Sequence, residues 1–169
     1  GKRVEKSLKS TLQFLDRCLE IKTSAPDMKD VLLFGAVQGG YLREERVRSA
    51  KGTADKNVDG FLIEGFHLNG RESGNIDMTC VEPLMREVVS LLPQDKPRLY
   101  QGSCDPLQVV ILVEIGVDLF ESSYASHITE EGRALKTMDQ LLDGSGRLSD
   151  SETAGSSVFS MNLKKAVYK

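Results

Sequence analysis

Polar side chains directly follow four short apolar segments, and their chemistry suits a flat polar ligand. The four positions carry two amides and two carboxylates, and three of them are followed by glycine: Gln38-Gly39, Glu64-Gly65, Gln101-Gly102 and Glu121-Ser122. An amide presents both a donor and an acceptor, and a glycine lets the backbone approach a ligand closely. This combination favours a planar ligand such as a nucleobase.

Purely structural roles are the alternative for each of these residues. Gln38 would then only tie its own turn, and Glu64 and Glu121 would cap the following helix or pair with an arginine. His67, which follows the second segment, would be an ordinary surface histidine rather than a base. The residue pattern alone leaves both interpretations open.

The cysteines and histidines predict no disulfide framework and no metal site in this chain. Cys18, Cys80 and Cys104 are odd in number and far apart, and no CxxC or CxC pair is present. His67 and His127 are isolated from them and from each other. Without a closed tetrahedral ligand set, we expect no zinc here, and the simplest compartment is a reducing, intracellular one.

Alternating hydrophobic patterns predict the elements that position the polar side chains. Apolar residues recur every three or four positions in the helical segments, whereas the strands are short and almost wholly apolar. The expected helices cover residues 2–22, 41–56, 77–92 and 105–115, and the expected strands cover 31–37, 59–65, 97–102 and 116–121. This order predicts an α/β fold with about four parallel strands, whose carboxyl ends carry the ligand site.

Composition and charge narrow the functional classes. The 169 residues carry 22 basic and 25 acidic side chains, a net charge of −3, which argues against a strongly basic nucleic-acid binder. Residues 1–58 hold 12 basic and 8 acidic groups, so a modest basic face is expected there. No apolar run approaches the roughly 18 residues of a membrane span, so we expect no transmembrane segment.

The last part of the chain departs from this pattern. Residues 138–157 are rich in Asp, Gly and Ser, so we expect a flexible loop over residues 136–157. Residues 158–163 alternate well enough to form one more strand within the terminal segment 158–169.

Four motifs resemble the tRNA-guanine transglycosylase family, in order and in register. They are LFGAVQGGYLREERVRSA (Leu33–Ala50), VDGFLIEGFHLNG (Val58–Gly70), DKPRLYQGSCDP (Asp95–Pro106) and GVDLFESSYAS (Gly116–Ser126). The resemblance covers residues 2–135 and implies the C-terminal half of a TIM (β/α)8 barrel over residues 1–135. The family's zinc-binding segment, with three Cys and one His, would lie beyond Lys169, so we expect Zn in the full-length protein and none in this chain. A half-barrel would expose two sheet edges.

The resemblance assigns Glu121 to the position of the family's nucleophile, an aspartate that attacks the ribose. The extra methylene displaces the carboxylate, and an error near 1 Å can cost ~100-fold in rate. The family's base pocket maps to Gln38, Gly39, Gly65 and Gln101. Gln38 keeps the amide that reads the base, whereas Glu64 replaces a small residue and Gln101 replaces a methionine that stacks on the base.

The family's anticodon-binding arginines are also replaced. They fall at His127 and Glu130, and an asparagine falls at Glu131, so the local charge is inverted for an RNA phosphate. We therefore expect no catalytic residue and a vestigial base pocket in this chain.

Together these departures resemble the non-catalytic subunit of a two-subunit family member. The implied function is dimerisation with a catalytic queuine tRNA-ribosyltransferase subunit and tRNA binding, while that heterodimer exchanges guanine at the wobble position for queuine. The expected location is cytoplasmic, with peripheral attachment to the mitochondrial outer membrane as a variant. Two alternatives stay open: an active transglycosylase that uses Glu121 as nucleophile, and an unrelated TIM-barrel enzyme that binds phosphate.

Overall fold

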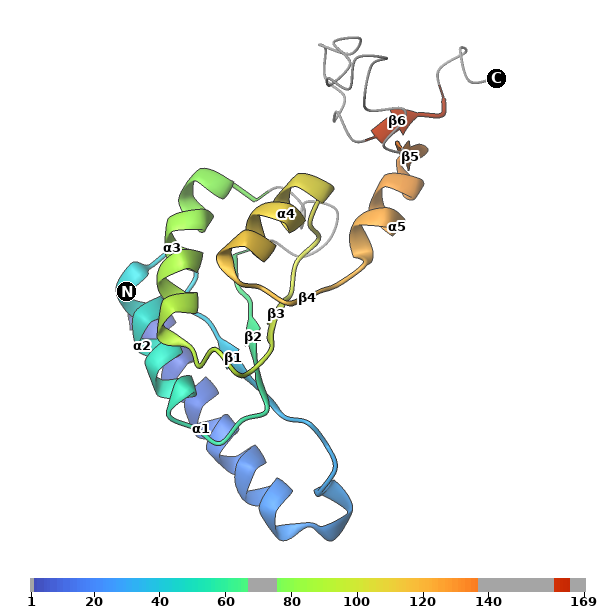
Figure 1. The fold of residues 1–169 in the computed structure, drawn as a ribbon. Helices are drawn as coiled ribbons and strands as arrows, with labels where there is room; N and C mark the ends of the chain where they lie inside the picture. The colour runs from blue at the N-terminus through green and yellow to red at the C-terminus, as the bar shows by residue number, and fades with distance from the viewer. Residues whose placement is uncertain (1, 67–75, 137–159, 165–169) are drawn as a thin grey trace.

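The computed structural model describes residues 2–66, 76–136 and 160–164 (Figure 1). Within them, a parallel sheet of order β1-β2-β3-β4 alternates with helices, as the sequence predicts. The strands are β1 (Phe34–Val37), β2 (Gly60–Ile63), β3 (Arg98–Tyr100) and β4 (Leu119–Phe120). The main helices are α1 (Lys2–Ser24), α2 (Arg43–Ala54), α3 (Met78–Leu91) and α4 (Pro106–Ile115). A short 3-10 helix, η1 (Pro26–Met28), follows α1.

Local signals in the sequence set the ends of the helices. The Asp77 side chain accepts a hydrogen bond from the backbone of Thr79 at the start of α3. Asp105 and Gln108 form a reciprocal capping box at the start of α4, and Gly116 ends that helix at φ 107°. A left-handed residue at this position is typically glycine because it has no Cβ to clash.

The strand register places one residue of each strand at the same level of the sheet. Ala36, Leu62, Leu99 and Leu119 form one such row, and Val37, Ile63, Tyr100 and Phe120 form the next. Successive side chains of a strand point to opposite faces, so the two rows face opposite ways. Val37, Ile63 and Tyr100 are fully buried, whereas Ala36, Leu62 and Leu99 are partly exposed and Leu119 is 45 % exposed.

Among the described residues, the helices α2, α3 and α4 cover the face that carries the buried row. In Figure 1, α2, α3 and α4 lie along the same side of the sheet, and α1 lies beside α2 next to β1. Buried residues of α3, namely Val81, Met85 and Val88, form the core with Phe61, Ile63 and Tyr100. We call the side that these helices cover the covered face and the other side the open face.

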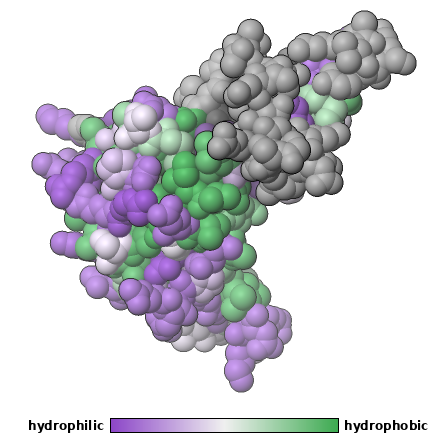
Figure 2. Space-filling model, turned by 45° about the horizontal axis from the view of Figure 1, so that its top comes forward, coloured by the Kyte–Doolittle hydropathy of each residue, from purple (hydrophilic) through white to green (hydrophobic). Residues whose placement is uncertain are grey.

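The two outer strands, β1 and β4, each have one side without a partner strand among the described residues. A half-barrel predicts such unpaired outer strands. The face turned toward the reader in Figure 2 shows a broad apolar area bordered by hydrophilic surface. On α4, Leu107, Val110 and Val113 are each more than half exposed.

From the fourth strand onward the structure corrects the expectation in three places. The fourth strand is only two residues long, and a helix that the sequence did not predict, α5 (Ser123–Glu130), follows it. A second unpredicted element, β5 (Arg133–Leu135), pairs antiparallel with β6 (Ser160–Asn162). β6 lies within the expected strand 158–163, and residues 137–157 of the expected loop lie outside the described residues.

The three cysteines are free in this structure: Cys18 and Cys80 are exposed and Cys104 is buried. None of the helices that the structure describes is long and apolar enough to cross a membrane.

Candidate functional site

The predicted site residues form one row at the carboxyl end of the sheet. Val37, Ile63, Tyr100 and Phe120 end their strands in register. The residue that follows each strand therefore lies next to its counterpart on the adjacent strand. Because successive side chains point to opposite faces, these four residues belong to the open face: Gln38, Glu64, Gln101 and Glu121. The parallel sheet thus places amides and carboxylates alternately along the carboxyl end of its strands.

Gln38 is hydrogen-bonded on both sides of its amide. Its Nε2 donates to Glu64 Oε1 on the neighbouring strand. The Thr11 hydroxyl of α1 donates to Gln38 Oε1 over 2.9 Å, and the Gln38 backbone N–H donates to Ser49 Oγ over 2.9 Å. One of the two N–H donors of the amide and one of the two acceptor sites of its oxygen are therefore taken by this chain's own side chains.

Glu121 and Gln101, on the other half of the row, are held much less firmly. Glu121 is exposed, and its Oε1 accepts a hydrogen bond from the Ser123 hydroxyl over 2.6 Å. It forms no ion pair within the described residues. Gln101 is exposed, and its side chain makes no hydrogen bond in the part of the chain that the structure describes.

Arg46 of α2 organises the turns after β1 and β2, although it is a charged side chain with only 1 % exposure. Its Nε donates to Gly40 O over 2.8 Å, and its Nη1 donates to Val37 O over 3.1 Å. The guanidinium lies 3.4 Å from the centroid of the Phe66 ring, a cation–π contact. Burial lowers the pKa of Arg46 to about 10, so it stays protonated at neutral pH.

The glycines of these turns adopt backbone conformations, or make close backbone contacts, that a residue with a side chain would not tolerate. Gly39 has φ 139°, and a Cβ there would lie 2.7 Å from the backbone nitrogen of Arg46. Gly65 has φ 83°, and Gly40 has φ 56° with no atom within 4 Å of its Cβ position. The chain therefore turns tightly at both strand ends and leaves open space in front of Gly40.

Two further groups lie buried under the row on the covered face. Burial raises the pKa of the Tyr100 hydroxyl, whose oxygen has no hydrogen-bond partner, and raises the pKa of the Cys104 thiol to about 12. A thiol with such a pKa is protonated at neutral pH and is a poor nucleophile.

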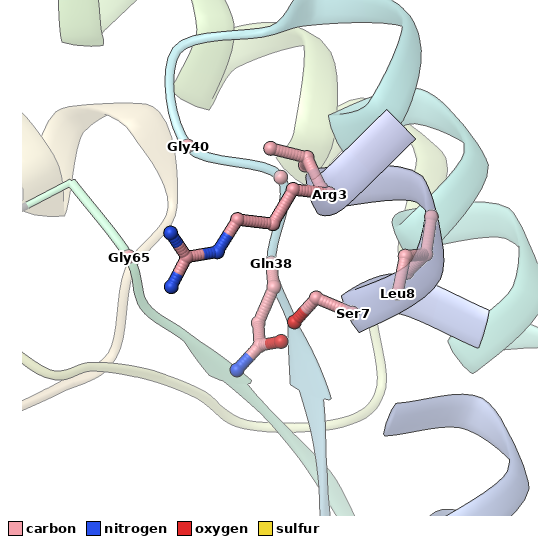
Figure 3. A pocket seen from close by; sticks show the side chains of 8 residues that line it. Arg3, Ser7, Leu8, Gln38, Gly40 and Gly65 are labelled. Carbon is pink, nitrogen blue, oxygen red and sulfur yellow. The ribbon is translucent and has the colours of Figure 1, made fainter. Parts of the chain in front are cut away.

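A cavity of about 320 Å³ lies between the first turns of α1 and this end of the sheet (Figure 3). Residues of α1 form one wall, and the turns after β1 and β2 form the other: Arg3, Val4, Ser7, Leu8, Gln38, Gly39, Gly40 and Gly65. In Figure 3 the Arg3 guanidinium extends toward Gly65, and the Ser7 hydroxyl lies on the side of Gln38. Three of the four residues expected in the base pocket line this cavity, and Gln101 does not.

The positions expected to contact an anticodon lie around a different cavity. His127, Glu130 and Glu131 line a space of about 280 Å³ together with Lys164. His127 Nδ1 lies 3.2 Å from the hydroxyl oxygen of Ser103, which is fully buried. This cavity presents two carboxylates and one ammonium group.

Sequence reasoning missed Arg46, Thr11 and Arg3. Arg46 belongs to a helix whose charged residues suggested a solvated face. One signal was present, because the small residues Ser49, Ala50 and Thr53 follow Arg46 at helical spacing and mark the buried side. Nothing in the sequence linked Thr11 to Gln38 across 27 positions. His67 lies outside the described residues.

No group of three or more His, Cys, Asp or Glu side chains in residues 2–66, 76–136 and 160–164 could hold a metal ion. The described residues therefore do not fit the zinc that the family resemblance implies.

Comparison with known proteins gives a family and a set of relatives. The family model described as queuine tRNA-ribosyltransferase matches residues 1–169. Proteins named queuine tRNA-ribosyltransferase accessory subunit 2 are similar to this chain. The protein from Xenopus tropicalis is 45 % identical over 79 % of this chain and 31 % of its own length. The protein from Danio rerio is 42 % identical over 92 % of this chain and 35 % of its own length. The protein from Ixodes scapularis is 41 % identical over 79 % of this chain and 34 % of its own length. The chain spans about a third of the length of these curated relatives.

Proposed function

The chain belongs to the queuine tRNA-ribosyltransferase family, the tRNA-guanine transglycosylases, and on that premise we propose that it is part of a non-catalytic subunit. In this proposal a catalytic paralogue exchanges guanine at the tRNA wobble position for queuine. The subunit described here pairs with that paralogue and contributes contacts with the tRNA. The naming of its relatives as accessory subunits supports this assignment.

The hydrogen bond between Gln38 and Glu64 is the observation that carries the proposal. The family resemblance makes Gln38 the amide that reads the base, and here that amide already has partners on both sides. A base would compete with the Glu64 carboxylate and the Thr11 hydroxyl for this amide, which keeps one N–H donor and one acceptor site. Breaking either of these hydrogen bonds costs roughly 1 kcal/mol, so base binding at Gln38 is weakened.

The position of Glu121 adds independent support. Its side chain is one methylene longer than the aspartate of the family, it is exposed, and the neighbouring Ser123 hydroxyl holds it. A nucleophile must meet the ribose carbon within a narrow range of distance and angle, and a carboxylate displaced by one methylene meets that requirement poorly.

The cavity at His127, Glu130 and Glu131 also favours a role without anticodon binding. Two carboxylates there face a region where the family uses arginines. RNA phosphates are attracted to clustered cations and repelled by carboxylates, so this subunit would leave the anticodon to its partner.

An active transglycosylase is the second candidate, and one observation favours it. The Glu121 carboxylate has no cation bound to it among the described residues, so it is free to attack an electrophile. This candidate predicts base exchange by the subunit alone.

Incorporation of labelled guanine into tRNA separates the two candidates. We expect no turnover by the full-length subunit alone and full turnover when the catalytic paralogue is added. Glu121→Asp alone should stay inactive, because groups that act as a unit are not restored one at a time. The same variant should still pair with the paralogue, which serves as its folding control. Appreciable exchange by the wild-type subunit alone would overturn the proposal.

Zinc and location complete the proposal. One structural zinc would be bound in the full-length protein through residues beyond Lys169, so metal analysis should find about one equivalent there and far less in the 169-residue chain. The proposed location is the cytoplasm, with peripheral attachment to the mitochondrial outer membrane as a variant, and subcellular fractionation tests it.

A further inference from the structure

Helix α4 exposes aliphatic side chains on the side that faces away from the sheet. Leu107, Val110 and Val113 are each more than half exposed, and Glu114 is the other exposed residue of this helix. The three aliphatic residues are spaced three positions apart, so they form a continuous row along the helix surface. We call this row the α4 ridge.

The two neighbouring helices of the same layer expose no such row. The exposed positions of α2 are all charged, namely Arg43, Glu44, Arg48 and Lys51. Helix α3 exposes no large aliphatic or aromatic side chain either. A helix that covers a sheet normally turns its polar side to water, so α4 is the exception among these three helices. A contiguous apolar row with a polar border marks a contact surface.

A further helix of the same layer cannot cover the α4 ridge. Gln108 and Leu112 are buried, and each is two positions from Val110, which therefore lies about 160° around the helix axis from both. Helices of one layer lie side by side along the sheet, as α3 does beside α4 (Figure 1). Completing the barrel adds helices in that position and leaves the side opposite the sheet uncovered. The occupant therefore comes from outside the layer.

The charges around the α4 ridge restrict what the occupant can be. Residues 99–132, which contain α4, carry six acidic side chains and no lysine or arginine. Asp105 caps the first turn of α4, Glu114 borders the ridge in the last turn, and Asp118 is exposed just beyond the helix. These carboxylates repel an RNA backbone, an anionic membrane and a second copy of the same face. They attract a basic surface.

We propose that the α4 ridge binds an amphipathic helix of another protein, whose apolar side chains are flanked by lysine or arginine. Side chains three positions apart form a ridge that fits the groove of a second helix. Asp105 and Glu114 lie near opposite ends of α4, so they favour basic residues near both ends of the partner helix. On the adjacent α3, Arg86 is paired with Glu82 and adds no uncompensated positive charge. This surface is separate from the row at the carboxyl end of the sheet, and its role does not depend on the function proposed above.

Two synthetic helical peptides test the proposal with the full-length protein. Both carry leucine at every third or fourth position, and the other positions are lysine in one peptide and glutamate in the other. We expect the lysine peptide to bind, measured by fluorescence anisotropy, with an affinity that falls as salt is added. The glutamate peptide should not bind. Absence of binding by the lysine peptide, or equal binding by both, would overturn the proposal.

Substitutions on the ridge locate the binding. Val110→Gln should weaken binding of the lysine peptide about tenfold, because it removes the central aliphatic side chain and keeps a good helix former. Leu107→Gln should act in the same direction and decides the matter if the first variant does not fold, which circular dichroism checks. The matched control is Phe14→Gln, because Phe14 is 71 % exposed on α1 at the other end of the helix layer. It should change the affinity less than about twofold, and weakening equal to that of the ridge variant would refute a specific site.

Sedimentation and vesicle binding test the other occupants. We expect Val110→Gln to change neither the oligomeric state of the full-length protein nor its binding to vesicles of phosphatidylcholine and phosphatidylserine. Self-association that this variant abolishes would assign the ridge to a second copy, and vesicle binding that it abolishes would assign it to a membrane. Either result would replace the proposed partner. The base-exchange assay tests the non-catalytic role separately, so failure of one proposal is distinguishable from failure of the other.

Discussion

The two faces of the sheet carry similar amino acids in very different surroundings. On β2, Ile63 is fully buried under the helices, whereas its neighbour Leu62 points the other way and is partly exposed. Exposure therefore depends on which layer lies opposite, and residue type does not determine it. The covered face obtains its layer from α2, α3 and α4, and in a complete barrel the open face would be covered by the other strands' side chains.

The largest effect should come from the covered face. Ile63→Ala removes a fully buried side chain from a core that cannot collapse around it, so we expect the free energy of unfolding to fall by about 3–4 kcal/mol. Urea unfolding of the 169-residue chain measures it. A loss below about 1 kcal/mol would show that the helices do not pack on this face as described.

The next effect should come from the buried charge in the covering layer. Arg46→Met leaves the Gly40 carbonyl without its side-chain donor and removes the cation from the Phe66 ring. Part of this loss is offset because an unpaired buried nitrogen also disappears, so we expect a net destabilisation of about 2 kcal/mol. The control is Arg48→Met on the same helix, where the side chain is 55 % exposed and unfolding should change by less than about 0.5 kcal/mol. Equal effects of the two variants would contradict the role of Arg46.

A smaller effect is expected on the open face, and its size should depend on chain length. Leu62→Ala should cost about 1 kcal/mol in the 169-residue chain, because the side chain is only partly buried. In the full-length protein the same change should cost about 3 kcal/mol if the remaining strands cover this face. Equal costs in the two chains would remove the basis for calling this face incomplete.

The smallest effect should come from an ion pair at the rim of the covering layer. The backbone N–H of Leu33 and then the Lys22 ammonium hold the pKa of Asp59 below its usual range. A lowered pKa in the folded state means that this contribution is present above the unfolded pKa near 4 and is lost as the pH falls through the folded value. Asp59→Asn should therefore lower stability at pH 7 by no more than about 1 kcal/mol and flatten the acid side of the stability profile. If the free energy of unfolding of the wild type and of Asp59→Asn fell equally as the pH was lowered below 4, the ionised Asp59 would not be the source of this stability.

The sequence predicted the repeated elements well and their contacts poorly. Apolar runs and capping residues such as Asp77 and Asp105 are local signals, so the helix and strand positions follow from short segments of chain. The parallel order then places Gln38, Glu64, Gln101 and Glu121 at one edge. The bond from Gln38 to Glu64 could not be predicted, because it depends on rotamers and on the Thr11 hydroxyl from a helix far away in sequence.

The same limit explains the elements missed after Glu121. The pairing of β5 with β6 joins residues far apart in the sequence, such as Arg133 with Asn162 and Leu135 with Ser160. A two-residue or three-residue strand has too few side chains for an alternating pattern to be recognised. Arg46 was missed because its charge predicted an exposed side chain. Its burial depends on hydrogen bonds to backbone carbonyl groups, which no pattern of residue types indicates.

The contact of Arg46 with the turns at Gly39 and Gly65 also constrains how this sequence can drift. A side chain at position 39 would meet the backbone of position 46, and one at position 65 would approach the guanidinium itself. The clash at position 39 is with backbone, so no change of side chain at position 46 relieves it and glycine should persist there. In directed evolution from this chain, by contrast, substitutions at positions 46, 65 and 66 should depend on one another, as expected of residues that share one packed contact.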